Sequence, residues 1–217
     1  SSGGGDTVLV LPGTYNESVY IGWNVNLIST DGPDTTFIEN YGMVINTNSN
    51  AYINGFSVKN SGALSYDTFL ANGAPTFENI KFVGSTTNES IITRTEGGGY
   101  TVKNCLFRDN SCSTIFSSPS SSAQVFNSTI IDNNNTNALS SCSGGNTVVN
   151  CIMRDNASIR FFGSGSVSYS NIDDDIYIGS TPVGIIGNNG NINEDPQFCD
   201  VSNNDFTLYD NSPCIGA

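Results

Sequence analysis

The chain has 217 residues, a formal net charge of −13 and no histidine. The negative charge opposes binding to nucleic acids and to anionic membrane surfaces, which both require basic patches, and no apolar run approaches the ~20 residues of a membrane span. Without histidine there can be no Ser-His-Asp triad, no Cys-His dyad and no histidine-ligated zinc site.

The chain opens with short strands separated by turns. Residues 1–5 are a flexible Gly/Ser stretch, and a Pro-Gly turn at residues 12–13 ends the first strand. The pattern predicts four strands in this opening region, within residues 6–18, 19–21, 25–28 and 36–39.

One short phrase then repeats along the middle of the chain. Its copies are Ile-Asn-Gly-Phe-Ser-Val (53–58), Phe-Glu-Asn-Ile-Lys-Phe (77–82), Val-Lys-Asn-Cys-Leu-Phe (102–107), Val-Phe-Asn-Ser-Thr-Ile (125–130), Val-Val-Asn-Cys-Ile-Met (148–153) and Val-Ser-Tyr-Ser-Asn-Ile (167–172). The third residues of the copies follow one another at spacings of 24, 25, 23, 23 and 19; they are Gly55, Asn79, Asn104, Asn127, Asn150 and Tyr169. A fixed period of this length predicts a solenoid, in which each repeat stacks on its neighbours.

Within each copy, apolar residues alternate, and the alternation changes phase at the third residue. Alternation indicates strands, and Gly or Asn at the break favours a bend in the left-handed conformation. In stacked coils these asparagines would form a ladder whose amides satisfy otherwise buried groups. We therefore assign a structural role, and no catalytic one, to Gly55, Asn79, Asn104, Asn127 and Asn150.

A second apolar run lies between the phrases, once per repeat and at nearly the same period, at residues 43–45, 69–70, 91–92, 114–116, 138–139 and 159–161. Coils with two or three short strands and no helices predict an all-β fold, a single-stranded right-handed parallel β-helix with ~23–25-residue coils. We expect one domain over 1–217, with N-terminal coils at 1–52, regular repeats at 53–175 and a C-terminal cap at 176–217.

The six cysteines fall into groups. Cys105 and Cys151 occupy one inward column two coils apart, too far for a disulfide, so we expect two buried thiols. Cys199 and Cys214 flank the final segment, where a disulfide would close a loop and indicate an oxidising, extracellular setting. The pairing of Cys112 and Cys142, which fall at different places in their coils, stays open.

Both ends of the chain resemble secreted right-handed parallel β-helix proteins of the pectate-lyase-like superfamily. The opening Gly-Asp-Thr-Val-Leu-Val-Leu-Pro-Gly-Thr-Tyr-Asn-Glu (5–17) and the closing Asp-Pro-Gln-Phe (195–198), Asp-Phe-Thr-Leu (205–208) and Ser-Pro-Cys-Ile-Gly-Ala (212–217) are similar to that group's phrases. The resemblance implies this fold and a secreted or cell-surface location. The helix that usually plugs the first coil is missing here, so we expect a segment of a longer precursor or assembly. The ends of such a β-helix would contact other copies or domains.

The enzymes of this superfamily cleave acidic polysaccharides with a Lys or Arg base and carboxylate-held calcium. Five basic residues lie around the bends and would form a broken stripe suited to a uronate or sulfate chain: Lys59, Lys81, Lys103, Arg108 and Arg154. The alternative is a surface charge lattice in which Arg108 and Arg154 offset stacked carboxylates.

A column of aspartates lies beside this stripe and is a candidate calcium site. It comprises Asp109, Asp132, Asp155 and Asp174, and Asp173 and Asp175 would extend it. The alternative is ordinary turn chemistry at coil corners, with no cofactor. The run at 173–175 resembles the paired carboxylates of polygalacturonases, but the accompanying His and Lys/Arg motifs are absent, so we interpret it as a corner.

Asn-x-Ser/Thr sequons give candidate glycosylation sites at Asn16, Asn88, Asn134 and Asn156, whereas Asn127 is expected to stay unmodified in the ladder. Since the catalytic sets are absent, the sequence favours a non-catalytic extracellular structural or adhesive module, which stacks end to end into a surface filament. The alternative is a polysaccharide-binding protein or a calcium-assisted polysaccharide lyase. A phage or surface-spike fibre domain would look the same.

Overall fold

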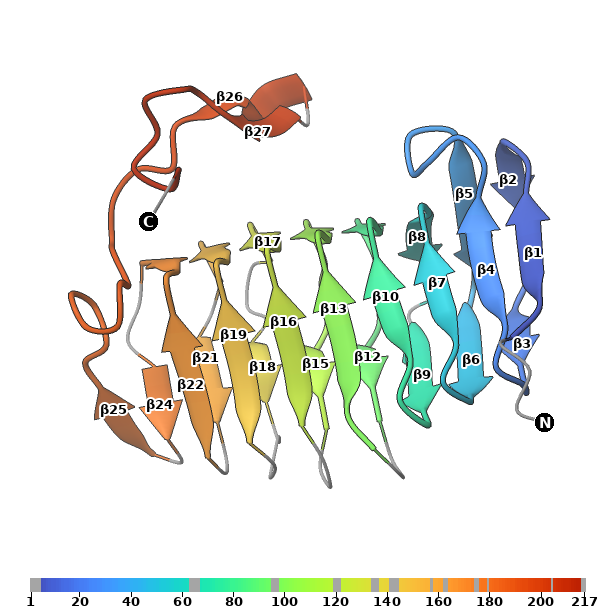
Figure 1. Ribbon diagram of the computed structural model, residues 1–217, viewed down its shortest axis with the longest axis horizontal. Helices are drawn as coiled ribbons and strands as arrows, with labels where there is room; N and C mark the ends of the chain where they lie inside the picture. The colour runs from blue at the N-terminus through green and yellow to red at the C-terminus, as the bar shows by residue number, and fades with distance from the viewer. Residues whose placement is uncertain are drawn as a thin grey trace.

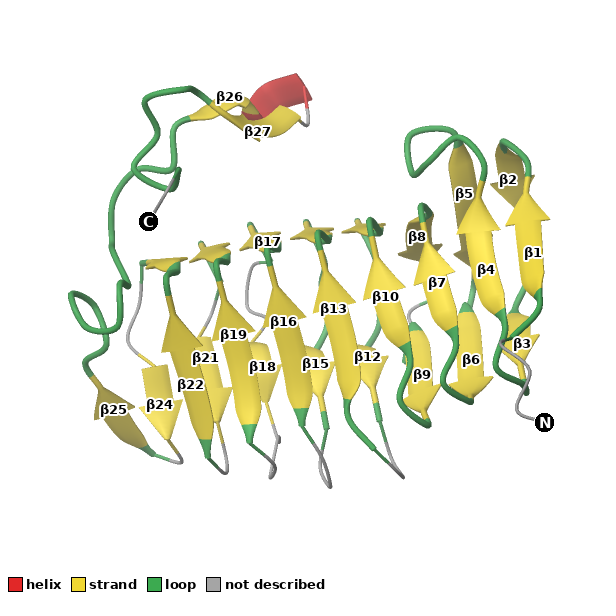
Figure 2. Cartoon of the chain, viewed as in Figure 1, coloured by secondary structure: helices red, strands yellow, loops and turns green. Residues whose placement is uncertain are grey.

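The computed structural model describes residues 5–62, 67–94, 98–118, 122–133, 137–140, 145–156, 158–161, 164–173, 176–178, 180–203 and 205–215. Three sheets of stacked strands run along the molecule, and successive strands of the chain enter them in turn (Figure 1). Among the described residues, the single helical element is the short 3-10 helix η1 (Val201–Asn203), and everything else is strand or loop (Figure 2). The prediction of an all-β parallel solenoid is confirmed.

The strands of each sheet are hydrogen-bonded in the order of the coils. Sheet A comprises β1 (Thr7–Val10), β4 (Asn26–Ser29), β7 (Tyr52–Asn54), β10 (Thr76–Glu78), β13 (Tyr100–Lys103), β16 (Ala123–Phe126), β19 (Asn146–Val149) and β22 (Gly165–Ser168). Sheet B comprises β2 (Gly13–Tyr15), β5 (Thr36–Asn40), β8 (Ser57–Asn60), β11 (Lys81–Val83), β14 (Leu106–Arg108), β17 (Thr129–Ile131), β20 (Ile152–Arg154) and β23 (Asn171–Ile172). Sheet C comprises β3 (Val19–Ile21), β6 (Ile45–Asn48), β9 (Phe69–Asn72), β12 (Ser90–Thr93), β15 (Thr114–Ser117), β18 (Asn137–Ser140), β21 (Ser158–Phe161), β24 (Ile176–Ile178) and the antiparallel β25 (Thr181–Val183). A separate antiparallel hairpin joins β26 (Phe198–Asp200) to β27 (Asp205–Leu208).

The repeat phrase spans the corner between sheets A and B, and its register is the predicted one. Phe77, Val102 and Val125 are successive partners in sheet A, and Phe82, Phe107 and Ile130 are successive partners in sheet B. The three residues that the alternation places inward in each copy are buried in every copy. Period-two alternation therefore located both strands of this corner correctly.

The bend between sheets A and B adopts the left-handed conformation, as predicted. Asparagines at this position have φ of 49° to 55°, Tyr169 has φ 51° and Gly55 has φ 86°. These six residues form what we call the bend column: Gly55, Asn79, Asn104, Asn127, Asn150 and Tyr169.

The asparagines of the bend column are exposed, which corrects the expectation that they satisfy buried groups. One bond runs from amide to amide within the described column, from Asn150 Nδ2 to Asn127 Oδ1 (2.9 Å). Asn79 donates instead to Asn54 Oδ1 (3.1 Å) and Asn104 to Glu78 Oε1 (3.4 Å). The four asparagines of the column therefore form a polar strip on the surface.

A second column, at the corner that follows sheet B, forms the buried ladder; we call it the inner column, and it comprises Asn60, Ser85, Asn110, Asn133 and Asn156. Asn110 Nδ2 donates to Asn133 Oδ1 (2.9 Å), and Asn133 Nδ2 donates to Asn156 Oδ1 (3.0 Å). The same amides also donate to backbone carbonyls such as Phe107 O (3.0 Å) and Phe82 O (2.9 Å). The inner column thus satisfies polar groups that burial would otherwise make costly.

The core between the three sheets contains a run of aromatic rings. Phe82 and Phe107 stack with centroids 4.5 Å apart and planes 6° from parallel, and Phe116 meets Phe107 edge-on at 4.9 Å. Phe69 joins the same run through Phe82 at 4.9 Å. All four rings are fully buried, so the run forms a continuous aromatic part of the core.

Candidate functional site: the groove beside the C-terminal arm

The chain does not end at the last coil. Residues 193–215, which we call the C-terminal arm, turn back over sheet B toward the first coils (Figure 1). Its hairpin is held together by a T-shaped contact between Phe198 and Phe206 at 5.1 Å, and Ser212 Oγ donates to Pro196 O (2.5 Å). Since this hairpin is a sheet of its own, the arm is attached to the solenoid through side chains.

The root of the arm is attached by Arg154, at the end of β20. Its Nη1 donates to Asn171 Oδ1 (2.9 Å), to Asn193 Oδ1 (3.0 Å) and to Glu194 O (3.0 Å). Asn171 Nδ2 donates to the same Glu194 carbonyl (2.7 Å) and to Cys214 Sγ (3.0 Å). A half-buried guanidinium and one buried amide therefore fix the beginning and the end of the arm together.

The tip of the arm is attached by Arg108, at the end of β14. Arg108 Nη1 donates to Val201 O (3.3 Å), and its guanidinium carbon lies 5.0 Å from the centroid of the Phe206 ring. A cation over an aromatic face is stabilised by the ring quadrupole. Arg108 thus holds the hairpin by a hydrogen bond and a cation–π contact.

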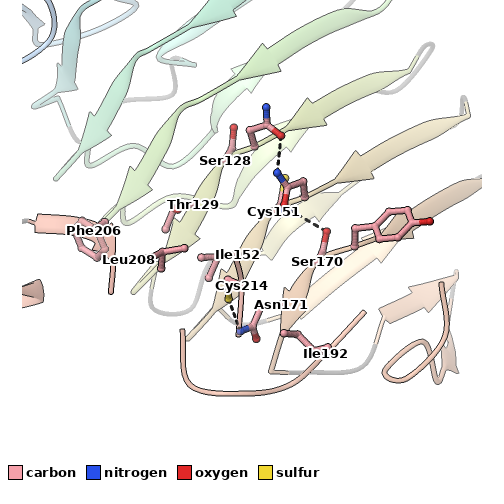
Figure 3. Close-up of a pocket in the computed structure, with 13 residues that line it drawn as sticks. Ser128, Thr129, Cys151, Ile152, Ser170, Asn171, Ile192, Phe206, Leu208 and Cys214 are labelled. Carbon is pink, nitrogen blue, oxygen red and sulfur yellow. Dashed lines mark hydrogen bonds between the residues drawn. The ribbon is translucent and has the colours of Figure 1, made fainter. Parts of the chain in front are cut away.

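A cavity of about 200 Å³ lies between the arm and the solenoid (Figure 3). Its floor comes from the bend column and the outer face of sheet B, with Asn127, Asn150 and Asn171 contributing amides. Its remaining wall comes from the arm, with Phe206 and Leu208. Amides, hydroxyls and the apolar Ile152 on the floor face apolar side chains of the arm across open space, so the arm is not packed on the solenoid like a core element.

A wider groove of about 790 Å³ continues from this cavity toward the first coils. Its floor holds Asn79 and Asn104 of the bend column beside Lys81 and Leu106 of sheet B. One wall is the loop between β4 and β5, with Gly32, Pro33 and Asp34, and the other is the hairpin of the arm, with Asp205, Phe206 and Thr207. The groove therefore exists because one coil has a long corner loop and because the arm folds back.

The charges around the groove oppose an anionic ligand. Asp34 forms an ion pair with Lys81, and hydrogen bonds from Thr207 lower the pKa of Asp205 on the opposite wall. A carboxylate thus stands on either side of a floor that holds Asn79 and Asn104 together with Leu106 and the paired Lys81. Carboxylates on both walls repel an anionic chain such as a uronate or a sulfated glycan.

The five predicted glycan-binding cations are not brought together into one stripe. Arg108 and Arg154 hold the arm, and Lys81 pairs with Asp34. Lys103 lies on sheet A, where it is the register partner of Glu78, and Lys59 lies exposed on sheet B. The role of these arginines as anchors was not visible in the sequence, because their acceptors lie some 40 to 90 residues away along the chain.

The described aspartates of the predicted calcium column are corner residues in the left-handed conformation. Asp109, Asp132 and Asp155 have φ of 53° to 55°, and Arg108 Nε lies 3.1 Å from Asp109 Oδ2 and 3.6 Å from Asp132 Oδ2. Burial raises the pKa of Asp132, and Arg108 opposes this shift. Asp174 lies outside the described residues. No group of three or more potential ligands among the described Cys, Asp and Glu side chains is placed to hold a metal ion.

The cysteines divide as expected in the core but not at the end of the chain. Cys105 and Cys151 are buried, and burial raises the pKa of each thiol to about 12. The predicted disulfide between Cys199 and Cys214 is not formed: both are free thiols. Cys199 lies on β26, whereas Cys214 is held against the solenoid by Asn171. Cys142 lies outside the described residues.

The structure separates the candidate glycosylation sites. Asn16 and Asn88 are exposed, whereas Asn156 Nδ2 already donates to Ile130 O (2.8 Å) and Arg154 O (2.9 Å) within the inner column. In a host that N-glycosylates, we expect glycopeptide mass spectrometry to find sugar on Asn16 and Asn88 and none on Asn156. Sugar on Asn156 in folded protein would contradict the inner column. Asn134 lies outside the described residues.

No helix among the described residues has the length and apolarity to cross a membrane. In the comparisons with known proteins, no family model matches the chain and no curated protein is significantly similar to it.

Proposed function

We propose that the chain is a non-catalytic structural or adhesive module of the cell exterior, which pairs with a second copy through its first coil. The observation that supports this proposal is the contrast between the two ends of the solenoid. The extracellular setting rests on the resemblance of residues 5–17 and 195–217 to secreted β-helix proteins.

The first coil is open. β1, β2 and β3 are the end strands of their sheets, so within the part of the chain that the structure describes one edge of each has no neighbouring strand. Val8 belongs to the core column of sheet A yet is 47% exposed, whereas its register partner Leu27 is 8% exposed. Leu9, Leu11, Tyr20 and Trp23 add further exposed apolar surface. Unpaired edges beside exposed apolar residues favour the addition of another β-structure.

The last coil is covered. β25 pairs with β24 in the antiparallel direction, and Tyr169 N and Ile172 N donate to Asn189 O (2.9 Å) and Ile192 O (2.9 Å) of the following loop. A head-to-tail filament would require this cover to be displaced. We therefore propose a head-to-head pair of two first coils, because an interface about a two-fold axis needs the same surface from both partners.

Sedimentation velocity over a range of concentrations tests the pair. We expect the wild type to form a dimer, and the double variant Leu9→Lys, Leu11→Lys to sediment as a monomer, since charged side chains block an open edge. Ile186→Lys, which places a charge on an exposed residue near the other end, is the matched control and should remain dimeric. Trp23, the single tryptophan, should show a blue shift on dimerisation. A wild type that stays monomeric at all concentrations would overturn the proposal.

The acidic-polysaccharide alternative is less well supported. Its two arginines are engaged by the arm, and the groove that could hold a chain carries carboxylates on both walls. Lys59 and Lys103 alone do not make a continuous basic surface.

A further inference from the structure

We propose that the C-terminal arm is a strap that swings off the solenoid about its root and thereby opens the cavity and the groove beneath it. This inference is independent of the pairing of first coils. It follows from how the arm is attached, what lies under it and how it is held together internally.

The attachment is local and made by side chains. At the root, Arg154 and Asn171 bind Asn193 Oδ1, Glu194 O and Cys214 Sγ, and at the tip Arg108 binds Val201 O and the Phe206 ring. The strands of the arm pair with each other and with no strand of sheets A, B or C. Detaching the arm therefore breaks no ladder of the solenoid.

The space under the arm is not filled by interdigitating side chains. The cavity lies between the amides of the bend column and the apolar side chains of Phe206 and Leu208. The cavity and the groove share Asn127, Thr129 and Phe206 in their linings, so the groove continues directly from the cavity. Removing the arm would expose the floor to water, where its amides and hydroxyls, such as Asn127, Asn150 and Thr129, are readily hydrated, although Ile152 is exposed with them.

The arm has the internal contacts needed to move as one body. Phe198 packs on Phe206, Tyr209 N donates to Gln197 O (3.0 Å), and Asp200 accepts from Ser202 Oγ (2.6 Å) and Asn203 Nδ2 (2.6 Å). These contacts do not involve the solenoid. The hinge then lies between Ile192, whose N donates to Ser170 O (2.9 Å) of the last coil, and Asn193, so the contacts of Arg154 with Asn193 and Glu194 break when the arm moves.

Cysteine labelling measures the opening directly. In a background with Cys112, Cys142 and Cys199 replaced by Ser, Cys214 reports on the arm, because its Sγ is held against Asn171 when the strap is closed. Cys105 and Cys151 stay as reporters of global unfolding, since both are buried and their thiols are protonated at neutral pH.

We expect Arg154→Ala to raise the labelling rate of Cys214 by about tenfold, which corresponds to about 1.4 kcal/mol, while Cys105 and Cys151 remain unlabelled. Arg160→Ala is the matched control: it removes the same charge and a cation–π contact with Tyr177 on sheet C, and should leave the rate within about twofold of the parent.

Asn193→Ala is the second variant, because it removes one acceptor of Arg154 on the arm itself and changes no residue of the coils. It should also raise the Cys214 labelling rate, but by less. An unchanged Cys214 rate in Arg154→Ala or Asn193→Ala would overturn the strap. Labelling of Cys105 and Cys151 together with Cys214 in Asn193→Ala would also overturn it, because opening would then be global unfolding.

Discussion

Replacing Phe107 by Ala is expected to lower the free energy of unfolding by about 3–5 kcal/mol. The ring is fully buried, stacks on Phe82 at 4.5 Å and meets Phe116 edge-on at 4.9 Å. Its loss removes apolar burial and two ring contacts, and it leaves a cavity between rings that belong to neighbouring coils. Because each coil stacks only on its neighbours, a defect in the middle of the stack weakens two interfaces at once.

Urea unfolding followed by circular dichroism measures this loss. Phe126→Ala is the matched control, since Phe126 is half-buried on the outer face of the neighbouring β16 and its removal leaves no core cavity. We expect the control to lose about 1 kcal/mol or less. Equal losses in the two variants would contradict the placement of Phe107 in the aromatic run.

The second large effect is expected for Asn133→Ala in the inner column, with a loss of about 3–5 kcal/mol. Asn133 Nδ2 donates to Phe107 O, Ile131 O and Asn156 Oδ1, each at 3.0 Å, and its Oδ1 accepts from Asn110 N (3.1 Å) and Asn110 Nδ2 (2.9 Å). Truncation leaves several buried groups without a partner, and each unsatisfied group costs about 1–3 kcal/mol.

Asn127→Gly provides the contrast within the same repeat. Asn127 belongs to the exposed bend column and has φ 49°, which glycine adopts without strain. Its replacement should therefore change stability by only a few tenths of a kcal/mol, although one exposed bond to Asn150 is lost. If Asn127→Gly were as damaging as Asn133→Ala, the two columns would have the opposite roles.

The corner between sheets A and B was predictable because its signals are local. The alternation of apolar residues around Asn104 indicates that Val102, Cys105 and Phe107 all face inward. The left-handed backbone of the bend itself favours Asn or Gly at its centre. Conformation, however, does not specify on which side of the wall a side chain lies. The buried ladder was therefore assigned to the bend column, although Asn110 and Asn133 recur with the same period and their preceding aspartates are the left-handed residues.

The arm was not predictable, because nothing periodic links it to the coils that it covers. Arg154 and Glu194, or Arg108 and Phe206, are brought together only when the last coil ends and the chain reverses. The basic residues recur near the bends because the phrase recurs, so their spacing predicted a basic stripe on the surface. The role of each residue depends instead on the partner that it contacts in the folded chain. The same reversal separates Cys199 from Cys214, which flank a segment in sequence but lie at different parts of the arm.

The two arginine anchors also make the arm a length gauge for the solenoid. Arg108 and Arg154 end β14 and β20, which are separated in sheet B by β17 alone, so about 10 Å of solenoid axis lies between them. Duplicating or deleting a coil within this interval would draw one anchor away from its contacts on the arm. Coils before β14 carry no such constraint, so changes in repeat number should be tolerated among β5, β8 and β11 and selected against between β14 and β20.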